Sequence, residues 1–290
     1  MSTSLADFST ALADLVDAQS RGVVSIRSHR SQSSGFAWRP DLIVTSDEAL
    51  ADDGEVSVVF ADGEAQAAQI VGRDVTTDIA LLRVEAATLA PVSLAPRPVR
   101  AGALALVVAA NGAAALAAVG SVAAFGPAWH SMRGGKIDAR IELDLRLRRA
   151  AQGGVAIDAG GDAFGMATFG PRRRVLVIPA ATIERVATAL LSHGRIPRGF
   201  LGLGLQPVRV EGFDGFGAII TGVAKGGPAA VAGARQGDVI VAWNGQPLQN
   251  FRSLFPSLGP DSIGQIVTLG IRRGGEPLEL PLTIGERPET

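Results

Sequence analysis

The sequence contains no cysteine, carries almost no net charge and has no long hydrophobic run. The absence of cysteine excludes a disulfide framework and a thiolate metal site. A formal net charge of -1 gives no overall attraction to nucleic acid or to anionic lipid. The longest largely apolar stretch, residues 101–126, is dominated by Ala and Gly, so no membrane span is predicted. The three histidines, His29, His130 and His193, have no second ligand at a recognisable spacing, and we predict neither a metal nor a cofactor.

The composition is that of a folded chain with room for about two domains. Apolar residues make up 47% of the sequence and charged residues 19%, which is ordinary for a globular protein. A length of 290 residues is enough for about two domains. Residues 1–17 lack the basic and continuous apolar regions of a secretory signal. We therefore expect a cytoplasmic protein if this chain is the full gene product.

The N-terminal segment has the periodicity of an amphipathic helix. Apolar residues recur there at helical intervals: Leu5, Phe8, Leu12, Leu15 and Val16. Thr3 or Ser4 can cap this helix, which we place within residues 1–20. Its apolar face either packs onto the first of the β-barrels predicted below or forms a contact between subunits.

From residue 22 onward the pattern changes to short strands separated by turns. We predict strands over residues 23–26, 36–38, 42–45, 56–60, 68–71, 99–110, 118–125, 137–143, 155–158 and 163–169. A turn is expected over residues 31–35. A last strand over residues 172–179 leads into a helix over residues 180–193, which Gly194 ends.

The centre of the chain is a five-residue stretch, Ala150-Ala151-Gln152-Gly153-Gly154, before a strand, a turn and a second strand. It resembles the nucleophile loop of HtrA/DegP-type serine proteases, in which the pattern is Gly-Asn-Ser-Gly-Gly. The resemblance places the nucleophile at Gln152 and an oxyanion-hole amide at Ala150. An amide side chain cannot be deprotonated to attack a carbonyl, so the family's acyl-enzyme chemistry is not expected here.

Two further motifs locate the other positions of the family's catalytic triad. Residues 72–84 are similar to the family pattern V-G-x-D-x-x-T-D-I-A-L-L-K-V, which places the orienting aspartate at Asp78. The segment ending in residues 45–50 resembles the family pattern D-G-Y-I-V-T-N-N-H-V-V, whose general-base histidine falls on Glu48. A glutamate near its usual pKa of about 4.3 is a poor base for a serine hydroxyl. The alternative for Glu48 is a solvated residue that begins a helical turn. For Asp78 it is a structural carboxylate that accepts hydrogen bonds from nearby backbone amides.

The resemblance implies a mainly β protein: a chymotrypsin-like double β-barrel followed by an α+β PDZ domain, with an N-terminal helix. The corresponding domains are the helix over residues 1–20, the protease-like domain over 21–194, a linker over 195–198 and the PDZ domain over 199–285. The PDZ resemblance is densest over residues 226–248, where Pro228 opens a helix, Gly233 ends it and Asn244-Gly245 closes a hairpin. A second PDZ helix is expected over residues 251–258.

A PDZ domain of this kind binds the C-terminus of a peptide between a carboxylate-binding loop and its second helix. The resemblance places that loop at residues 200–203, and the alternative is a hairpin edge that binds nothing. The predicted peptide-binding residues are Phe200, Leu201, Gly202, Leu203, Leu205, Phe251, Leu254 and Phe255.

Six arginines flank the former nucleophile on two loops that wall the substrate pocket in the family: Arg146, Arg148, Arg149, Arg172, Arg173 and Arg174. If the two loops converge, they form a cationic site for a carboxylate or a phosphate. The alternative is two solvated basic turns.

The sequence therefore predicts an inactive HtrA-like homologue that acts as a peptide-binding or protein-binding scaffold through its PDZ domain. The alternative is an active serine endopeptidase with a rearranged site, because Ser46 lies two positions from Glu48. The resemblance implies protein or peptide C-termini as partners, a homo-oligomer such as a trimer, and a periplasmic location if a signal has been removed.

Overall fold

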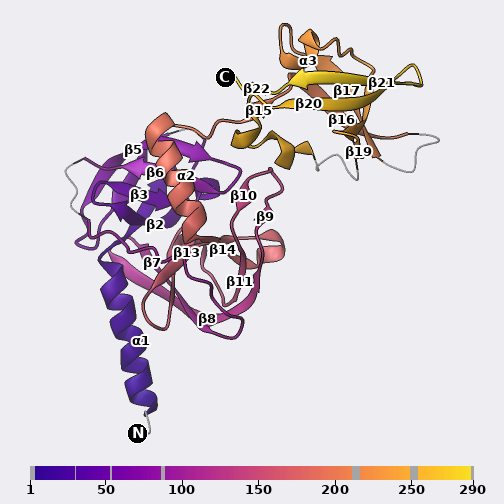
Figure 1. The fold of residues 1–290 in the computed structure, drawn as a ribbon. Helices are drawn as coiled ribbons and strands as arrows, with labels where there is room; N and C mark the ends of the chain where they lie inside the picture. The colour runs from indigo at the N-terminus through magenta and orange to yellow at the C-terminus, as the bar shows by residue number, and fades with distance from the viewer. Residues whose placement is uncertain are drawn as a thin grey trace. The chain divides into compact units, whose positions relative to one another are not determined.

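The computed structural model describes residues 4–29, 31–52, 54–85, 89–210, 216–248 and 254–288. The chain forms two compact units, one of residues 1–131 and 136–196 and the other of residues 132–135 and 197–290. The first unit contains two closed six-stranded barrels, and the second is a mainly β unit with a five-strand path in its largest sheet. The mainly β class predicted from the sequence is thereby confirmed (Figure 1).

The N-terminal helix α1 spans Leu5–Ser20 and begins at a capping box. The Asp7 amide donates to Ser4 Oγ at 3.1 Å, and the Ser4 amide donates to Asp7 Oδ2 at 3.0 Å. These two bonds satisfy N–H groups that a helix start leaves without partners. Leu12 and Leu15 pack against the core of the first unit, whereas Leu5 is 84% exposed. The helix contacts β1 of the first barrel, as one of the two expectations had it, and it also contacts β7 and β8 of the second barrel.

The first barrel has the strand order β1-β2-β3-β6-β5-β4. Its strands are β1 (Val23–Ser28), β2 (Ser31–Arg39), β3 (Leu42–Thr45), β4 (Val56–Val59), β5 (Ala65–Asp74) and β6 (Ile79–Arg83). The turn predicted over residues 31–35 is wrong, because β2 begins at Ser31 and pairs with β1 from Ser31 to Phe36. The serines in this segment are strand residues: Ser33 and Ser34 are buried, and Ser34 makes hydrogen bonds to the second barrel.

The second barrel has the strand order β11-β14-β13-β12-β7-β8. Its strands are β7 (Leu104–Asn111), β8 (Ala114–Gly126), β11 (Arg140–Asp144), β12 (Val155–Asp158), β13 (Ala163–Phe169) and β14 (Val175–Pro179). A separate pair, β9 (Trp129–His130) and β10 (Lys136–Ile137), precedes β11, so the single strand predicted over 137–143 is broken in two. Two other predicted strands start later than expected, at Leu104 and Val175.

The core of the first unit joins the two barrels. Phe36 and Leu81 from the first barrel share one buried cluster with Leu106 and Val155 from the second. Helix α2 (Ala180–His193) covers the same cluster with Ile183 and ends at Gly194, whose φ of 71° is the left-handed value expected of a C-terminal glycine. This shared core holds the facing loops of the two barrels in a defined position.

The second unit is built on the sheet β16-β17-β18-β20-β21. Its strands are β15 (Gly199–Phe200), β16 (Leu203–Arg209), β17 (Phe216–Val223), β18 (Val239–Trp243), β19 (Gln246–Pro247), β20 (Ile266–Arg273), β21 (Glu276–Thr283) and β22 (Gly285–Glu286), and its short helix is α3 (Pro228–Val231). A second helix was predicted over 251–258; the described residues 254–258 of that segment contain 3-10 structure at Leu254 and at Pro256–Leu258 and no α-helix. Strand β16 ends the order of the sheet, so one of its edges is open among the described strands.

Candidate functional site

The three residues that the resemblance assigns to a catalytic triad come from three separate segments of the first unit. Glu48 lies in a 3-10 turn, Asp47–Ala49, that follows β3. Asp78 immediately precedes β6 and has a φ of 59°, a left-handed conformation that Asp tolerates better than most residues. Gln152 follows the 3-10 turn Arg149–Ala151, just before the glycines that lead into β12. The structure therefore brings the three positions to the junction of the two barrels.

Gln152 takes part in a buried polar network that the sequence did not reveal. Its Nε2 donates to Ser46 Oγ at 2.9 Å and approaches Thr168 Oγ1 at 3.4 Å. Ser46 Oγ lies 2.8 and 2.9 Å from the two carboxylate oxygens of Asp78, and Thr168 Oγ1 donates to Asp78 Oδ2. Gln152 is only 8% exposed and Ser46 is fully buried. The glutamine amide is thus held inward by hydrogen bonds, at the place where the resemblance puts a nucleophile.

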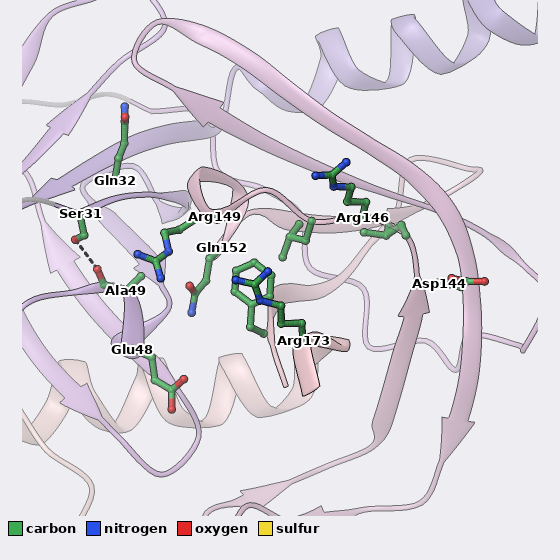
Figure 2. A pocket seen from close by; sticks show the side chains of 12 residues that line it. Ser31, Gln32, Glu48, Ala49, Asp144, Arg146, Arg149, Gln152 and Arg173 are labelled. Atoms are coloured by element: carbon green, nitrogen blue, oxygen red, sulfur yellow. Dashed lines mark hydrogen bonds between the residues drawn. The ribbon is translucent and has the colours of Figure 1, made fainter. Parts of the chain in front are cut away.

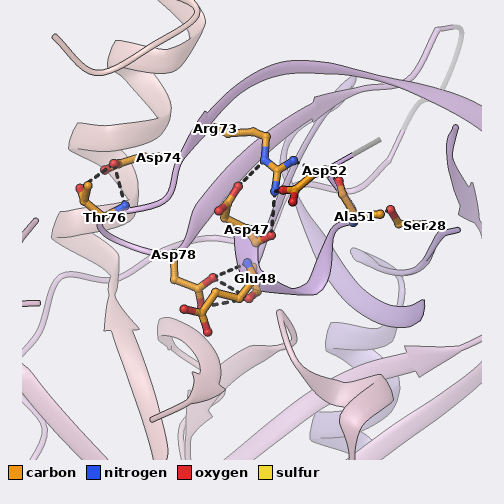
Figure 3. Close-up of polar contacts among 10 residues, drawn as sticks. Ser28, Asp47, Glu48, Ala51, Asp52, Arg73, Asp74, Thr76 and Asp78 are labelled. Atoms are coloured by element: carbon orange, nitrogen blue, oxygen red, sulfur yellow. Dashed lines mark hydrogen bonds and ion pairs between the residues drawn. The ribbon is translucent and has the colours of Figure 1, made fainter. Parts of the chain in front are cut away.

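The carboxylate of Asp78 accepts hydrogen bonds from several donors. Besides the two hydroxyl groups, its Oδ1 accepts the backbone amide of Glu48 at 2.8 Å, a contact visible in Figure 3. Burial raises the pKa of Asp78 from its ordinary value of 3.8 to about 6, although the hydrogen bonds from Glu48, Thr168 and Ser46 oppose that rise. The contact with an amide is the structural role that the sequence left open for this residue.

The raised pKa predicts a pH dependence of stability that belongs to Asp78. The folded state binds a proton on this carboxylate more tightly than the unfolded state, so stability is lost as the pH rises from about 4 through about 6. Two pKa units correspond to at most about 3 kcal/mol of unfolding free energy. Urea unfolding across this range should show the loss in the unaltered chain and a flatter profile in Asp78→Asn. Parallel profiles of the two proteins would contradict the assignment.

The backbone of the former nucleophile loop uses its amides internally. The Ala151 amide donates to the Arg148 carbonyl at 2.9 Å, and the Gln152 amide donates to the Arg149 carbonyl at 3.1 Å. In trypsin-like proteases the amides of the nucleophile and of the residue two before it point at the developing oxyanion. The Gln152 amide is therefore already engaged, and the Ala150 carbonyl is held by Ser34 Oγ at 2.7 Å.

The glycine after Gln152 is required by a close contact between the barrels. Gly153 has a φ of 85°, and a Cβ there would lie 2.1 Å from the Ser34 carbonyl oxygen. The Ser34 amide donates to the Gln152 carbonyl at 2.8 Å across the same junction. These contacts between β2 and the loop fix the position of Gln152.

A salt bridge holds the turn that carries Glu48. Arg73 Nε pairs with Asp47 Oδ1 at 2.5 Å, and Arg73 Nη1 donates to the Ala51 carbonyl at 3.1 Å (Figure 3). Asp47 is 2% exposed, whereas Glu48 is exposed, as expected for a solvated turn residue. This pair was not predicted, since nothing in the spacing of Asp47 and Arg73 indicates their contact.

A cavity of about 890 Å³ opens beside Gln152, with both barrels contributing to its walls. Its lining includes Arg146, Arg149 and Arg173, together with Glu48. In Figure 2 the guanidinium groups of Arg149 and Arg173 lie on either side of the Gln152 side chain. The predicted arginine loops thus converge only in part. The remaining three arginines, Arg148, Arg172 and Arg174, do not line the cavity, and Arg174 pairs with Glu142 at 3.1 Å.

The predicted peptide loop in the second unit has backbone donors available. The N–H groups of Leu201 and Gly202 donate to no acceptor among the described residues, whereas their carbonyls accept the amides of Ala229 and Ala224. Gly202 has a φ of 76°, which favours glycine at this position. This local geometry is compatible with a loop that presents amides to an anion.

The side chains predicted to line the peptide groove are placed unequally. Phe200, Leu203 and Leu205 are partly exposed, whereas Leu201 is buried. Leu254 is only 2% exposed and packs in the core of the unit, and its place on a groove wall stays a prediction. Phe255 is 36% exposed. Phe251 lies outside the described residues.

Within the described residues, no three His, Cys, Asp or Glu side chains are grouped closely enough to hold a metal ion. In the same part of the chain, no helix has both the length and the apolar character needed to cross a membrane.

Comparison with family models gives two matches. A trypsin-like peptidase domain model matches residues 33–166, and a PDZ domain model matches residues 199–284. Among curated proteins, a "Probable periplasmic serine endoprotease DegP-like" of Bartonella henselae is 32% identical over 283 residues, which cover 91% of this chain and 56% of the relative. The protein of the same name from Chlamydia pneumoniae is 28% identical over 276 residues, covering 89% and 56%. The chain thus spans about half the length of the curated relatives it matches.

Solved structures show the same fold. An HtrA-type protease AlgW with a decapeptide superposes with a TM-score of 0.72 at 22% identity, covering 96% of this chain and 99% of that one. A serine endoprotease from Yersinia pestis gives a TM-score of 0.70 at 22% identity, covering 95% and 98%. At this level of identity the similarity establishes the fold.

Proposed function

We propose that this chain, which matches a trypsin-like peptidase domain over residues 33–166 and a PDZ domain over residues 199–284, is a catalytically inactive homologue of the HtrA/DegP-like serine proteases that binds peptides. The observation that carries the proposal is the position of Gln152, whose amide is buried and donates to Ser46 Oγ where a nucleophile would have to be free. Glu48 occupies the position of the general base and supplies no imidazole. The site therefore lacks both groups that transfer the proton and attack the carbonyl.

We propose that the PDZ domain is the part of the chain that binds the peptide. Its loop offers the unengaged N–H groups of Leu201 and Gly202, and strand β16 beside them has an open edge among the described strands. An extended peptide can add to such an edge as a further strand while its terminal carboxylate accepts the loop amides. We propose protein or peptide C-termini with an apolar last residue as the ligands.

A second candidate function is an active endopeptidase with a rearranged site. It is favoured by the Ser46 hydroxyl, which lies 2.8 Å from a carboxylate oxygen of Asp78, a residue whose pKa is raised to about 6 by burial. A carboxylate in this range can act as a general base near neutral pH. Against it, Ser46 is fully buried beneath Gln152 and cannot reach a substrate carbonyl without a rearrangement.

The two functions are separated by measuring binding and hydrolysis on one preparation. If the protein is an inactive peptide-binding homologue, we expect it to bind peptides through their C-termini and to leave an unfolded protein uncleaved. If the protein is an active endopeptidase with a rearranged site, we expect it to cleave the unfolded protein. Ser46→Ala should then abolish the cleavage, and Asp78→Asn should shift the pH profile of the cleavage rate. Thr10→Ala, a hydroxyl removal on α1 far from the junction in sequence, serves as the matched control for a change in hydroxyl count.

We extend the proposal to organisation and location. The protease-like domain is assigned to residues 21–194 and the PDZ domain to 199–285, joined by a linker over 195–198.

A trimer follows from the resemblance, and light scattering after size exclusion tests it. The names of the relatives favour the periplasm for this chain, and fractionation of the native host tests that location.

A further inference from the structure

The cavity beside Gln152 combines three features that the proposed PDZ function does not use. Its volume of about 890 Å³ is that of a ligand site rather than a packing defect. Arg146, Arg149 and Arg173 line it and are exposed. Among the described residues these three guanidinium groups make no hydrogen bond and no ion pair, whereas the neighbouring Arg174 is paired with Glu142. Cationic donors thus remain available at the cavity.

The loop that carries Arg173 has an unfavourable backbone conformation. Arg172 and Arg173 have φ values of 58° and 59°, a left-handed conformation that side chains other than those of Gly, Asn and Asp rarely adopt. Strain of this kind is found where the position of a side chain matters to function. Here the turn places Arg173 on the cavity wall, opposite Arg149 in Figure 2.

The net charge of the residues that line the cavity favours a ligand with a single negative charge. Glu48 and Asp144 also line the cavity, so the three guanidinium groups exceed the carboxylates by one positive charge. A singly charged carboxylate neutralises that excess, and planar guanidinium groups can bind it through two parallel hydrogen bonds. A doubly charged phosphate would leave the site with a net negative charge. The lining also includes Leu147 and Phe169, which offer contact area to apolar parts of a ligand.

We propose that this cavity binds the side-chain carboxylate of a glutamate or aspartate in an extended peptide, with the carboxylate held by Arg149 and Arg173. The inference goes beyond the proposed function, because the ligand enters the former catalytic cleft rather than the PDZ groove. A peptide bound there remains intact if Gln152 occupies the place of the nucleophile. The site would make the protein a receptor for acidic segments.

The test uses fluorescence anisotropy with the full chain and a short labelled peptide of alanine and leucine around one glutamate. The peptide ends in an amide, so that it cannot use a carboxylate-binding loop. At an ionic strength of about 0.01 M, where charge contacts are weakly screened, the peptide is expected to bind at least about tenfold more tightly than its glutamine counterpart. Failure of the glutamate peptide to bind would overturn the proposal. Gly202→Ala is expected to leave this binding unchanged, which separates it from failure of the PDZ proposal.

Variants of the same two loops provide a matched control. Arg149→Gln with Arg173→Gln is expected to weaken binding at least about tenfold, because two charge-assisted contacts are lost. Arg148→Gln with Arg172→Gln removes the same charge from the same loops outside the cavity, and at an ionic strength of about 0.15 M, where distant charges are screened, it is expected to change the dissociation constant less than Arg149→Gln with Arg173→Gln does. Equal weakening by both pairs would overturn the site in favour of general electrostatic attraction.

Two further measurements complete the test. Thermal unfolding checks that both double variants remain folded, and the single variant Arg149→Gln replaces the first pair if it does not. A phosphoserine peptide is compared with the glutamate peptide on the unaltered chain. Binding of the phosphopeptide more than about tenfold tighter would contradict the assignment of a carboxylate as the ligand.

Discussion

Purified protein is expected to hydrolyse an unfolded substrate such as casein no faster than a buffer control, and Gln152→Ser alone is expected to change nothing. Removal of the serine or the histidine from a triad hydrolase costs about 10⁶ in kcat. In the proposed assignment both positions are altered, to Gln152 and Glu48. Gln152→Ser restores a hydroxyl that has no imidazole to accept its proton.

Even the double variant Glu48→His with Gln152→Ser is expected to remain well below an intact hydrolase. The amide of residue 152 donates to the Arg149 carbonyl, so an oxyanion donor is missing, which costs about 10²–10³ in rate. Gln32→Ser introduces a hydroxyl elsewhere on the cavity wall and is the matched control. Turnover by the unaltered chain that Gln152→Ala abolishes would contradict this prediction.

Amidation of a peptide's C-terminus is expected to weaken its binding to the PDZ domain on the order of 100-fold, as charge-assisted hydrogen bonds contribute about 1.5–3 kcal/mol each. The N–H groups of Leu201 and Gly202 are the donors that a terminal carboxylate would use. An amide presents one oxygen and no charge, and its NH₂ group faces donors rather than acceptors. Isothermal titration of one peptide in its free and amidated forms measures the difference directly.

Two glycine variants provide the control for this result. Gly202→Ala places a side chain at a φ of 76° and 3.3 Å from Ala224 Cβ, so it is expected to displace the loop amides and weaken binding about tenfold. A Cβ at Gly222 on β17 meets no atom within 4 Å, so Gly222→Ala is expected to bind normally. Equal retention of free and amidated peptides would leave strand pairing with internal segments as the mode of recognition.

The parts of the fold that could be predicted are those that short-range patterns encode. Residues 72–84 form a recognisable motif that located Asp78, whereas strand β6 within the same segment was not predicted. The helix predicted over residues 180–193 is confirmed as α2, because its end depends on Gly194, a turn residue with a known backbone preference. The serines of β2 misled the prediction, since their role as buried contacts between barrels depends on residues more than 70 positions away, as in the bond from Ser34 to Ala110.

The candidate site depended more heavily on tertiary structure. The positions of Gln152 and Asp78 followed from the motifs, but their connection through Ser46 and Thr168 joins segments far apart in the sequence. For the arginines, the composition of the two loops indicated a cationic site, whereas which members line the cavity depends on how each turn directs its side chains. Leu254 was predicted on a groove wall, and its packing in the core of the second unit depends on tertiary contacts that its local sequence does not show.

The most direct test of the central claim is labelling with a fluorophosphonate, followed by intact-mass analysis, beside an active trypsin-like protease as a positive control. A fluorophosphonate reacts with a serine only if a base activates the hydroxyl and the site stabilises the resulting oxyanion. The account predicts the unmodified mass for this chain under conditions that label the control completely. A stoichiometric adduct on Ser46, lost in Ser46→Ala, would show instead that the buried hydroxyl becomes a working nucleophile and would contradict the account.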